Sequence, residues 1–118
     1  MDRQHEAAIN AVERTISASQ ALRTNLRSGE VIGRKMIKRL EGGVPISAAV
    51  SAAGADASDL RQTTNDLLDA FEHSRHEMRL AFISPALDEG MSIGEIGRTL
   101  GVSRQLAARL AKEARGPH

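Results

Sequence analysis

The fold is decided by Ser92-Ile-Gly-Glu-Ile-Gly-Arg-Thr-Leu-Gly-Val-Ser-Arg-Gln-Leu-Ala-Ala-Arg-Leu110, a stretch that predicts two short helices joined by a tight turn. Ser92 stands three residues before Glu95, the spacing of a capping box, in which each side chain bonds a backbone N–H left free at a helix start. Gly101 is expected to end the first helix at positive φ, where a Cβ would be strained. Ser103 is expected to cap the second helix.

The residues between these caps predict how the two helices pack. Gly97 would let the second backbone approach closely, because a larger side chain would hold it away. Six apolar side chains are expected to make the contacts between the helices: Ile93, Ile96, Leu100, Val102, Leu106 and Leu110. The second helix would then present a basic and amide surface to solvent: Arg104, Gln105, Ala108, Arg109 and Lys112.

This stretch resembles the helix-turn-helix DNA-binding domain of bacterial transcriptional regulators, of the homeodomain-like or sigma-factor type. The core Glu-Ile-Gly-x-x-Leu-Gly-Val-Ser-Arg-Gln carries the resemblance, which covers residues 84–114. Gly97 stands where alanine is commoner in such domains, and Ile93 where many carry an aromatic residue. The resemblance implies a trihelical unit over 84–118 that binds double-stranded DNA through Ser92, Arg98, Ser103, Arg104, Gln105, Ala108, Arg109 and Lys112. A helical hairpin that only packs, without touching nucleic acid, is the alternative.

Charge is unevenly distributed along the chain, whose formal net charge is +1. From Ser92 onward there are five basic and two acidic residues, a net charge of +3, so residues 1–91 carry −2. Basic residues thus gather in the segment expected to meet phosphates. Arg104 and Gln105 also have the donors that match guanine O6/N7 and adenine N6/N7, so we expect them to specify sequence.

Composition excludes several classes of protein. The chain has 118 residues and no cysteine, so neither a disulfide framework nor a zinc finger with thiolate ligands is expected. We find no apolar run near 18 residues and no charged-then-apolar leader, which disfavours membrane insertion and secretion. The expected location is the cytoplasm, at the nucleoid.

Residues 1–83 are predicted to form a helical module for dimerisation or for binding a protein partner. No window alternates apolar and polar residues, so the expected fold class is all-α, a helical bundle with the C-terminal trihelical unit. The first helix, over 4–27, is predicted from apolar or small residues at three- and four-residue steps: Ala8, Val12, Ile16, Ser19, Leu22 and Leu26.

Three more helices are expected before the C-terminal unit. The second covers 31–40 and ends at Gly42-Gly43, and a short third runs from Pro45 to Ala53. A long fourth helix, capped by Asp56 or Ser58, is expected to end where Ser84-Pro85 breaks it. Its stripe has a period near three and a half: Leu60, Thr64, Leu67, Phe71, Met78 and Phe82.

A weak internal repeat appears when the chain is shifted by 47 residues. Leu40, Gly43, Ile46 and Gly54 then fall on Leu87, Gly90, Ile93 and Gly101, which suggests a degenerate helix-turn-helix at 40–72. Its second helix would be acidic and repelled by phosphates, so this copy would serve packing or a protein partner.

No catalytic or cofactor motif is present in the sequence, so neither an enzyme nor a cofactor is expected. Glu72-His73-x-x-His76-Glu77 has a spacing that could hold a metal, but we interpret it as a solvated helix face and expect no metal site. Only Phe71 and Phe82 are aromatic. Stacking on single-stranded nucleic acid or RNA is therefore disfavoured, as is an aromatic-lined pocket for a sensed ligand.

The function predicted from the sequence is sequence-specific binding of duplex DNA by a transcriptional regulator. A single reader helix makes few base contacts, so we expect a homodimer on a pseudo-palindromic site. Two alternatives stay open: a nucleoid-associated protein of low sequence specificity, and a protein-interaction adaptor of the transcription machinery.

Overall fold

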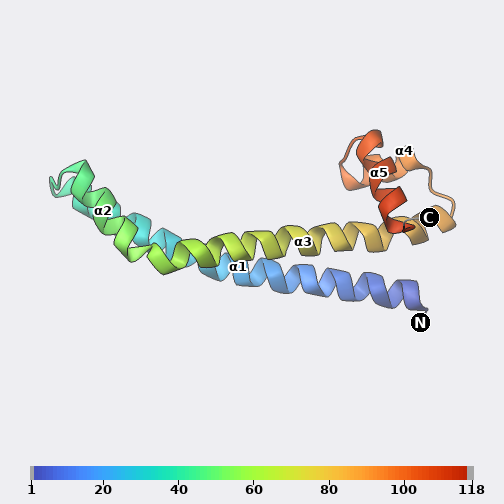
Figure 1. The fold of residues 1–118 in the computed structure, drawn as a ribbon, viewed down its shortest axis with the longest axis horizontal. Helices are drawn as coiled ribbons and strands as arrows, with labels where there is room; N and C mark the ends of the chain where they lie inside the picture. The colour runs from blue at the N-terminus through green and yellow to red at the C-terminus, as the bar shows by residue number, and fades with distance from the viewer. Residues whose placement is uncertain (1, 117–118) are drawn as a thin grey trace. The chain divides into compact units, whose positions relative to one another are not determined.

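The computed structural model describes residues 2–116, and within that range the chain forms five helices and no strand (Figure 1). The all-α fold class is therefore confirmed. No helix in this range is long and apolar enough to cross a lipid bilayer. The helices are α1 (Arg3–Glu41), α2 (Ile46–Asp56), α3 (Ser58–Asp88), α4 (Ile93–Leu100) and α5 (Arg104–Ala114).

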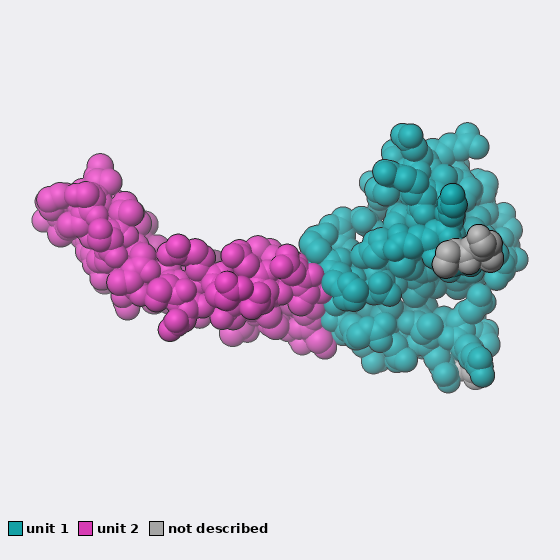
Figure 2. Space-filling view, in the orientation of Figure 1, with its two compact units in different colours: residues 1–16, 72–118 teal, residues 17–71 magenta. Residues whose placement is uncertain are grey.

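The chain divides into two units, which Figure 2 shows in two colours. Unit 1 comprises residues 1–16 and 72–118, and unit 2 comprises residues 17–71. Each unit contains part of α1 and part of α3, which run side by side within it (Figure 1). Unit 1 also contains α4 and α5, and unit 2 contains α2.

Helix α1 is continuous over 39 residues, so the prediction of two helices, over 4–27 and 31–40, is wrong. Gly29 lies inside the helix, at a half-buried position that continues the three- and four-residue steps of the face turned to α3. Packing of that face offsets the cost of about 1 kcal/mol that glycine imposes on a helix interior. The helix ends with Gly43 at φ 83°, and the Val44 N–H donates to the Arg39 carbonyl at 3.0 Å.

The face that α1 turns to α3 differs from the predicted stripe. Of the residues in that stripe, Val12 and Leu22 are half-buried, whereas Ile16, Ser19 and Leu26 are exposed. Small and polar residues share this contact with large apolar ones. In unit 2 the partly or fully buried positions are Ala18, Leu22, Asn25, Gly29, Ile32, Met36 and Arg39 of α1, with Leu60, Thr64, Leu67 and Phe71 of α3.

One buried polar contact lies in the α1–α3 interface of unit 2. The Thr64 hydroxyl donates to Asn25 Oδ1 at 2.5 Å, and Asn25 is buried. A hydrogen-bonded polar pair at such an interface fixes the register of the two helices, since any slip would leave the buried Asn25 side chain without this partner.

Helix α2 begins after Pro45, as predicted, and continues to Asp56, three residues beyond the predicted end. Arg39 of α1 pairs with Asp56 at 3.3 Å. Gly54, which the internal repeat aligns with Gly101, lies inside α2, and Ala57 alone joins α2 to α3. The backbone conformation at Gly54 therefore differs from that at Gly101, with which the repeat aligns it.

Helix α3 continues through Pro85 to Asp88, so the prediction that Ser84-Pro85 breaks it is wrong. Proline removes one N–H donor and costs about 3 kcal/mol inside a helix. The turn that contains Pro85 also contains Ile83 and Leu87, which pack in the core of unit 1 and offset that cost.

Unit 1 has a core formed where α3, α4 and α5 meet. Its buried members are Ile83, Ile96, Ala107, Leu110 and Ala111. Around them pack partly buried apolar residues: Leu80, Ala86, Leu87, Met91, Ile93, Leu100, Val102, Leu106 and Ala114.

Candidate nucleic-acid interface

The start and end of α4 have the geometry expected from the sequence. The Glu95 N–H donates to Ser92 Oγ at 3.1 Å, and the Ser92 N–H donates to Glu95 Oε1 at 3.4 Å, which completes the capping box. Gly101 ends the helix at φ 71°, and the Val102 N–H donates to the Gly97 carbonyl at 2.9 Å. Both caps are confirmed.

Helix α5 follows after a three-residue connection and is capped as predicted, because the Leu106 N–H donates to Ser103 Oγ at 3.0 Å. Gly97 lies where α4 approaches this connection. A Cβ at that position would lie 3.1 Å from the Val102 carbonyl oxygen and 3.6 Å from the Ala107 Cβ. The predicted close approach at Gly97 is thus confirmed, and it fixes the position of α5 on α4.

The six apolar residues predicted to hold α4 and α5 together all belong to the core of unit 1. The sequence prediction missed Ile83, Ala107 and Ala111, which are buried in the same core. Ala107 and Ala111 stand on the same face of α5 as Leu110, at three- and four-residue spacing, a signal that was available. Ile83 was missed because the break expected at Ser84 placed it outside the C-terminal unit.

Helix α5 has two faces of opposite character. Ala107, Leu110 and Ala111 are buried against α3 and α4. All eight residues predicted to contact DNA are exposed, five of them on α5: Arg104, Gln105, Ala108, Arg109 and Lys112, with Ser103 at its cap and Ser92 and Arg98 at the two ends of α4.

The polar side chains of this exposed face make no hydrogen bond or ion pair with the rest of the described chain. Within residues 2–116, no side-chain hydrogen bond or ion pair engages Arg104, Gln105, Arg109 or Lys112. Their donors therefore point to solvent and are available to a ligand. We refer to the exposed residues 104, 105, 108, 109 and 112 as the α5 face.

The C-terminal end of α5 is held to α3 by a hydrogen bond and an ion pair. His76 Nε2 lies 2.8 Å from Glu113 Oε1, and Arg115 donates to Asp88 Oδ1 at 3.1 Å. Asp88 also accepts from Gln4 Nε2 at 3.3 Å. The hydrogen bonds from Gln4 and from Arg115 lower the pKa of the Asp88 carboxyl.

The cluster at Glu72, His73, His76 and Glu77 does not assemble a metal site. In the part of the chain that the structure describes, no three His, Cys, Asp or Glu residues gather closely enough to hold a metal ion. His76 pairs with Glu113 instead, and His73 is exposed.

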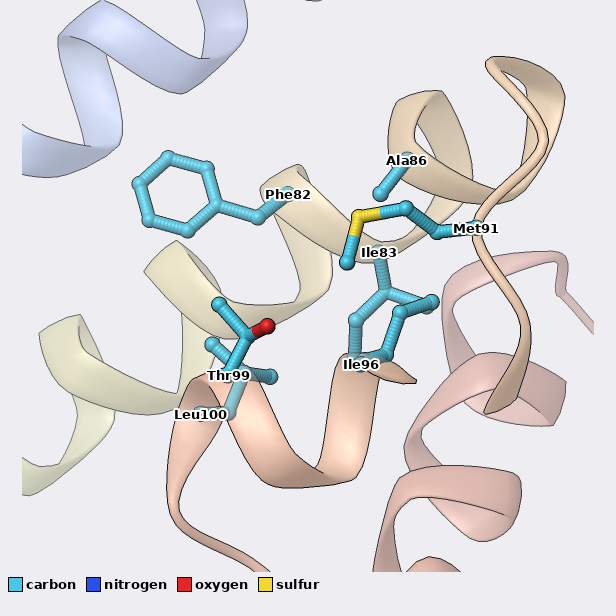
Figure 3. Close-up of a pocket in the computed structure, with 7 residues that line it drawn as sticks. All are labelled: Phe82, Ile83, Ala86, Met91, Ile96, Thr99 and Leu100. Atoms are coloured by element: carbon cyan, nitrogen blue, oxygen red, sulfur yellow. The ribbon is translucent and has the colours of Figure 1, made fainter. Parts of the chain in front are cut away.

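An apolar hollow of about 240 Å³ lies between α3 and α4, beside the core of unit 1 (Figure 3). Thr99 supplies the one hydroxyl among its lining side chains, and Phe82 the one aromatic ring. The other lining residues are Ile83, Ala86, Met91, Ile96 and Leu100. With a single polar group, the hollow offers little to fix the orientation of a ligand.

Comparisons of this chain with protein-family models, with curated proteins and with solved structures find no match. What this chain binds is therefore inferred from the geometry of unit 1 and the chemistry of the α5 face.

Proposed function

We propose that this chain is a transcriptional regulator that binds duplex DNA sequence-specifically and acts as a homodimer. In this proposal, α4, the turn at Gly101 and α5 serve as a helix-turn-helix, and α5 is the reader helix. The observation that supports it best is the α5 face, where basic and amide side chains without intramolecular partners stand opposite a buried apolar face.

The roles of the side chains follow from their positions along α5. Arg104 and Gln105 occupy the first turn, the part of a reader helix that enters the major groove. Arg104 has the bidentate donors that fit guanine O6 and N7, and the Gln105 amide fits adenine N6 and N7. The small side chain of Ala108 leaves room for a base edge or a thymine methyl group on the same face.

The remaining candidate residues are assigned to the DNA backbone. Arg109 and Lys112 lie one and two turns further along α5, and Arg98 lies near the end of α4. Their charges would neutralise phosphates, while Ser92 and Ser103 sit at helix starts, where backbone N–H groups favour anions. With about three phosphates neutralised by each subunit, a dimer should lose affinity with salt at a log–log slope of roughly −5.

Selection of bound duplexes from a random pool tests this proposal. The unmodified chain should enrich one motif with two related half-sites, because two reader helices meet one duplex. Lys112→Ala should weaken binding to all sequences about equally, whereas Arg14→Ala, at an exposed arginine of α1 within unit 1, is the matched control and should leave binding unchanged.

Other outcomes would assign a different function. Binding without an enriched motif would make the chain a nucleoid-associated protein of low specificity. Absence of binding at moderate salt would contradict DNA binding and favour an adaptor of the transcription machinery.

A further inference from the structure

Unit 2 buries little and exposes much of its apolar surface. Its buried residues are Asn25 and Ala49, so none of its large apolar side chains is fully covered. So little apolar burial offsets only part of the conformational entropy that the chain loses on folding. Burial against another surface would add to the stability of the unit. Its exposed large apolar residues are Leu26, Val31, Ile37, Leu40, Val44, Ile46, Val50 and Leu68.

These exposed residues are ordered rather than scattered. Leu26, Ile37 and Leu40 each follow by one residue a partly or fully buried position of α1, so they form a second stripe beside its buried face. On α2, Ile46 and Val50 are 72% and 52% exposed and stand one helical turn apart. We call Leu26, Ile37 and Leu40 the apolar stripe of unit 2, and Ile46 and Val50 add exposed apolar surface on α2.

Within unit 2, α1 and α3 carry opposite net charges. The part of α1 within unit 2 has six basic and two acidic residues, a net charge of +4. The part of α3 within unit 2 carries Asp59, Asp66 and Asp69 against one arginine, a net charge of −2. Among the described residues, no ion pair joins α1 to α3 in this unit. These charges are therefore available to a partner.

We infer that the apolar stripe of unit 2 binds the same surface of a second copy of this chain. A two-fold interface places one patch against itself, so the patch must be self-complementary. Unit 2 meets that condition, because one copy carries both an apolar stripe and helices of opposite charge. The basic side of α1 then faces the acidic side of α3 of the second copy. Nucleic acid could pair with the basic side of α1, but it would be repelled by the acidic side of α3 and would leave the apolar stripe uncovered, which argues against it as the occupant.

This inference rests on the proposed function in one respect: the interface would form the dimer that spans two half-sites. The dimer itself is tested without DNA. Sedimentation equilibrium of the full chain at micromolar concentration should give twice the chain mass of 12.7 kDa. Because each substitution occurs twice in a dimer, Ile37→Lys with Leu40→Lys should raise the dimer dissociation constant at least about 100-fold. Ser17→Lys is the matched control, since Ser17 is an exposed residue of α1 in unit 2 outside both the stripe and the basic side.

A charge swap tests the pairing of α1 with α3. One variant reverses the basic side by Arg23→Glu with Arg27→Glu, and the other reverses the acidic side by Asp66→Lys with Asp69→Lys. Each variant alone should dimerise at least about 10-fold more weakly, because like charges then meet twice. An equimolar mixture should recover the affinity of the unmodified chain, since opposite charges meet again in the mixed dimer. Unchanged helix content by circular dichroism shows that each variant folds.

A monomer at micromolar concentration would overturn the inference, and so would a mixture that fails to recover. Unchanged dimerisation of the lysine variant would also overturn it, by placing the interface elsewhere. These failures are distinguishable from failure of the proposed function. A stripe variant should still bind a single half-site, and Gln105→Ala should remain a dimer while losing sequence readout.

Discussion

Unit 1 and unit 2 differ in what they bury. Unit 1 encloses Ile83, Ile96 and Leu110 in one core and exposes polar side chains on α5. Unit 2 is held by an interface rich in small and polar residues and leaves many of its large apolar residues on the outside. Unit 1 therefore has a core of its own, whereas unit 2 exposes an apolar surface that a second copy covers in the proposed dimer.

The largest expected difference between the units comes from truncating apolar residues. Ile83→Ala should reduce the free energy of unfolding by about 2–5 kcal/mol at any protein concentration, because Ile83 is 1% exposed. Ile37→Ala, at a position 55% exposed in the single chain, should reduce stability only where the dimer forms. Denaturant unfolding at several protein concentrations distinguishes the two variants. Equal losses of stability that do not depend on concentration would contradict this difference between the units.

The polar pair in the α1–α3 interface of unit 2 should be the next most sensitive feature. Thr64→Val leaves the buried Asn25 side chain without its partner and should cost about 1–3 kcal/mol. Thr64→Val with Asn25→Val removes both polar groups and should cost less than the sum of the two single changes. Strict additivity in urea unfolding would show that the hydrogen bond contributes nothing to stability.

Two glycines should respond in opposite directions to the same substitution. Gly101→Ala should destabilise unit 1 by about 1–2 kcal/mol, because Gly101 lies at φ 71°. Gly54→Ala should stabilise unit 2 by about 0.5–1 kcal/mol, because Gly54 lies inside α2 and a Cβ there meets no atom within 4 Å. Thermal unfolding of both variants gives the sign of each change in stability. A stabilising Gly101→Ala would contradict a left-handed backbone at Gly101.

The smallest expected effect is the acid dependence of the contacts that hold α5 to α3. Hydrogen bonds from Gln4 and Arg115 lower the pKa of Asp88 below its usual 3.8. Stability from this carboxylate is therefore complete above that value and is lost as the pH falls through the lowered pKa. Asp88→Asn should make the stability of unit 1 less dependent on pH in this acidic range. An unchanged acid profile would show that Asp88 does not contribute.

Local signals in the sequence predicted the C-terminal part of the chain well. The caps at Ser92 and Ser103, the left-handed Gly101 and the exposure of the α5 face all follow from residues within a few positions of one another. Long-range packing decided the features that the sequence did not reveal. The continuity of α1 through Gly29 and of α3 through Pro85 depends on burial against other helices, which overrides local preference.

The exposed stripe shows a second kind of limit. An apolar stripe on α1 was expected to need a partner, but its periodicity could not show which face turns to α3. In the structure Asn25 and Thr64 occupy that contact, while Ile16 and Leu26 remain outside. Two overlapping stripes on one helix cannot be assigned from spacing alone, because either could face α3.

One comparison of binding constants decides whether the α5 face reads DNA sequence. The affinities of the unmodified chain and of Gln105→Ala are measured on the selected site and on random duplex at one salt concentration. Loss of the amide should cost about 1–3 kcal/mol on the selected site and much less on random DNA, so the specificity ratio should fall. Equal losses on the two duplexes would make Gln105 a phosphate contact, and unchanged affinity on both would contradict a reader role for α5.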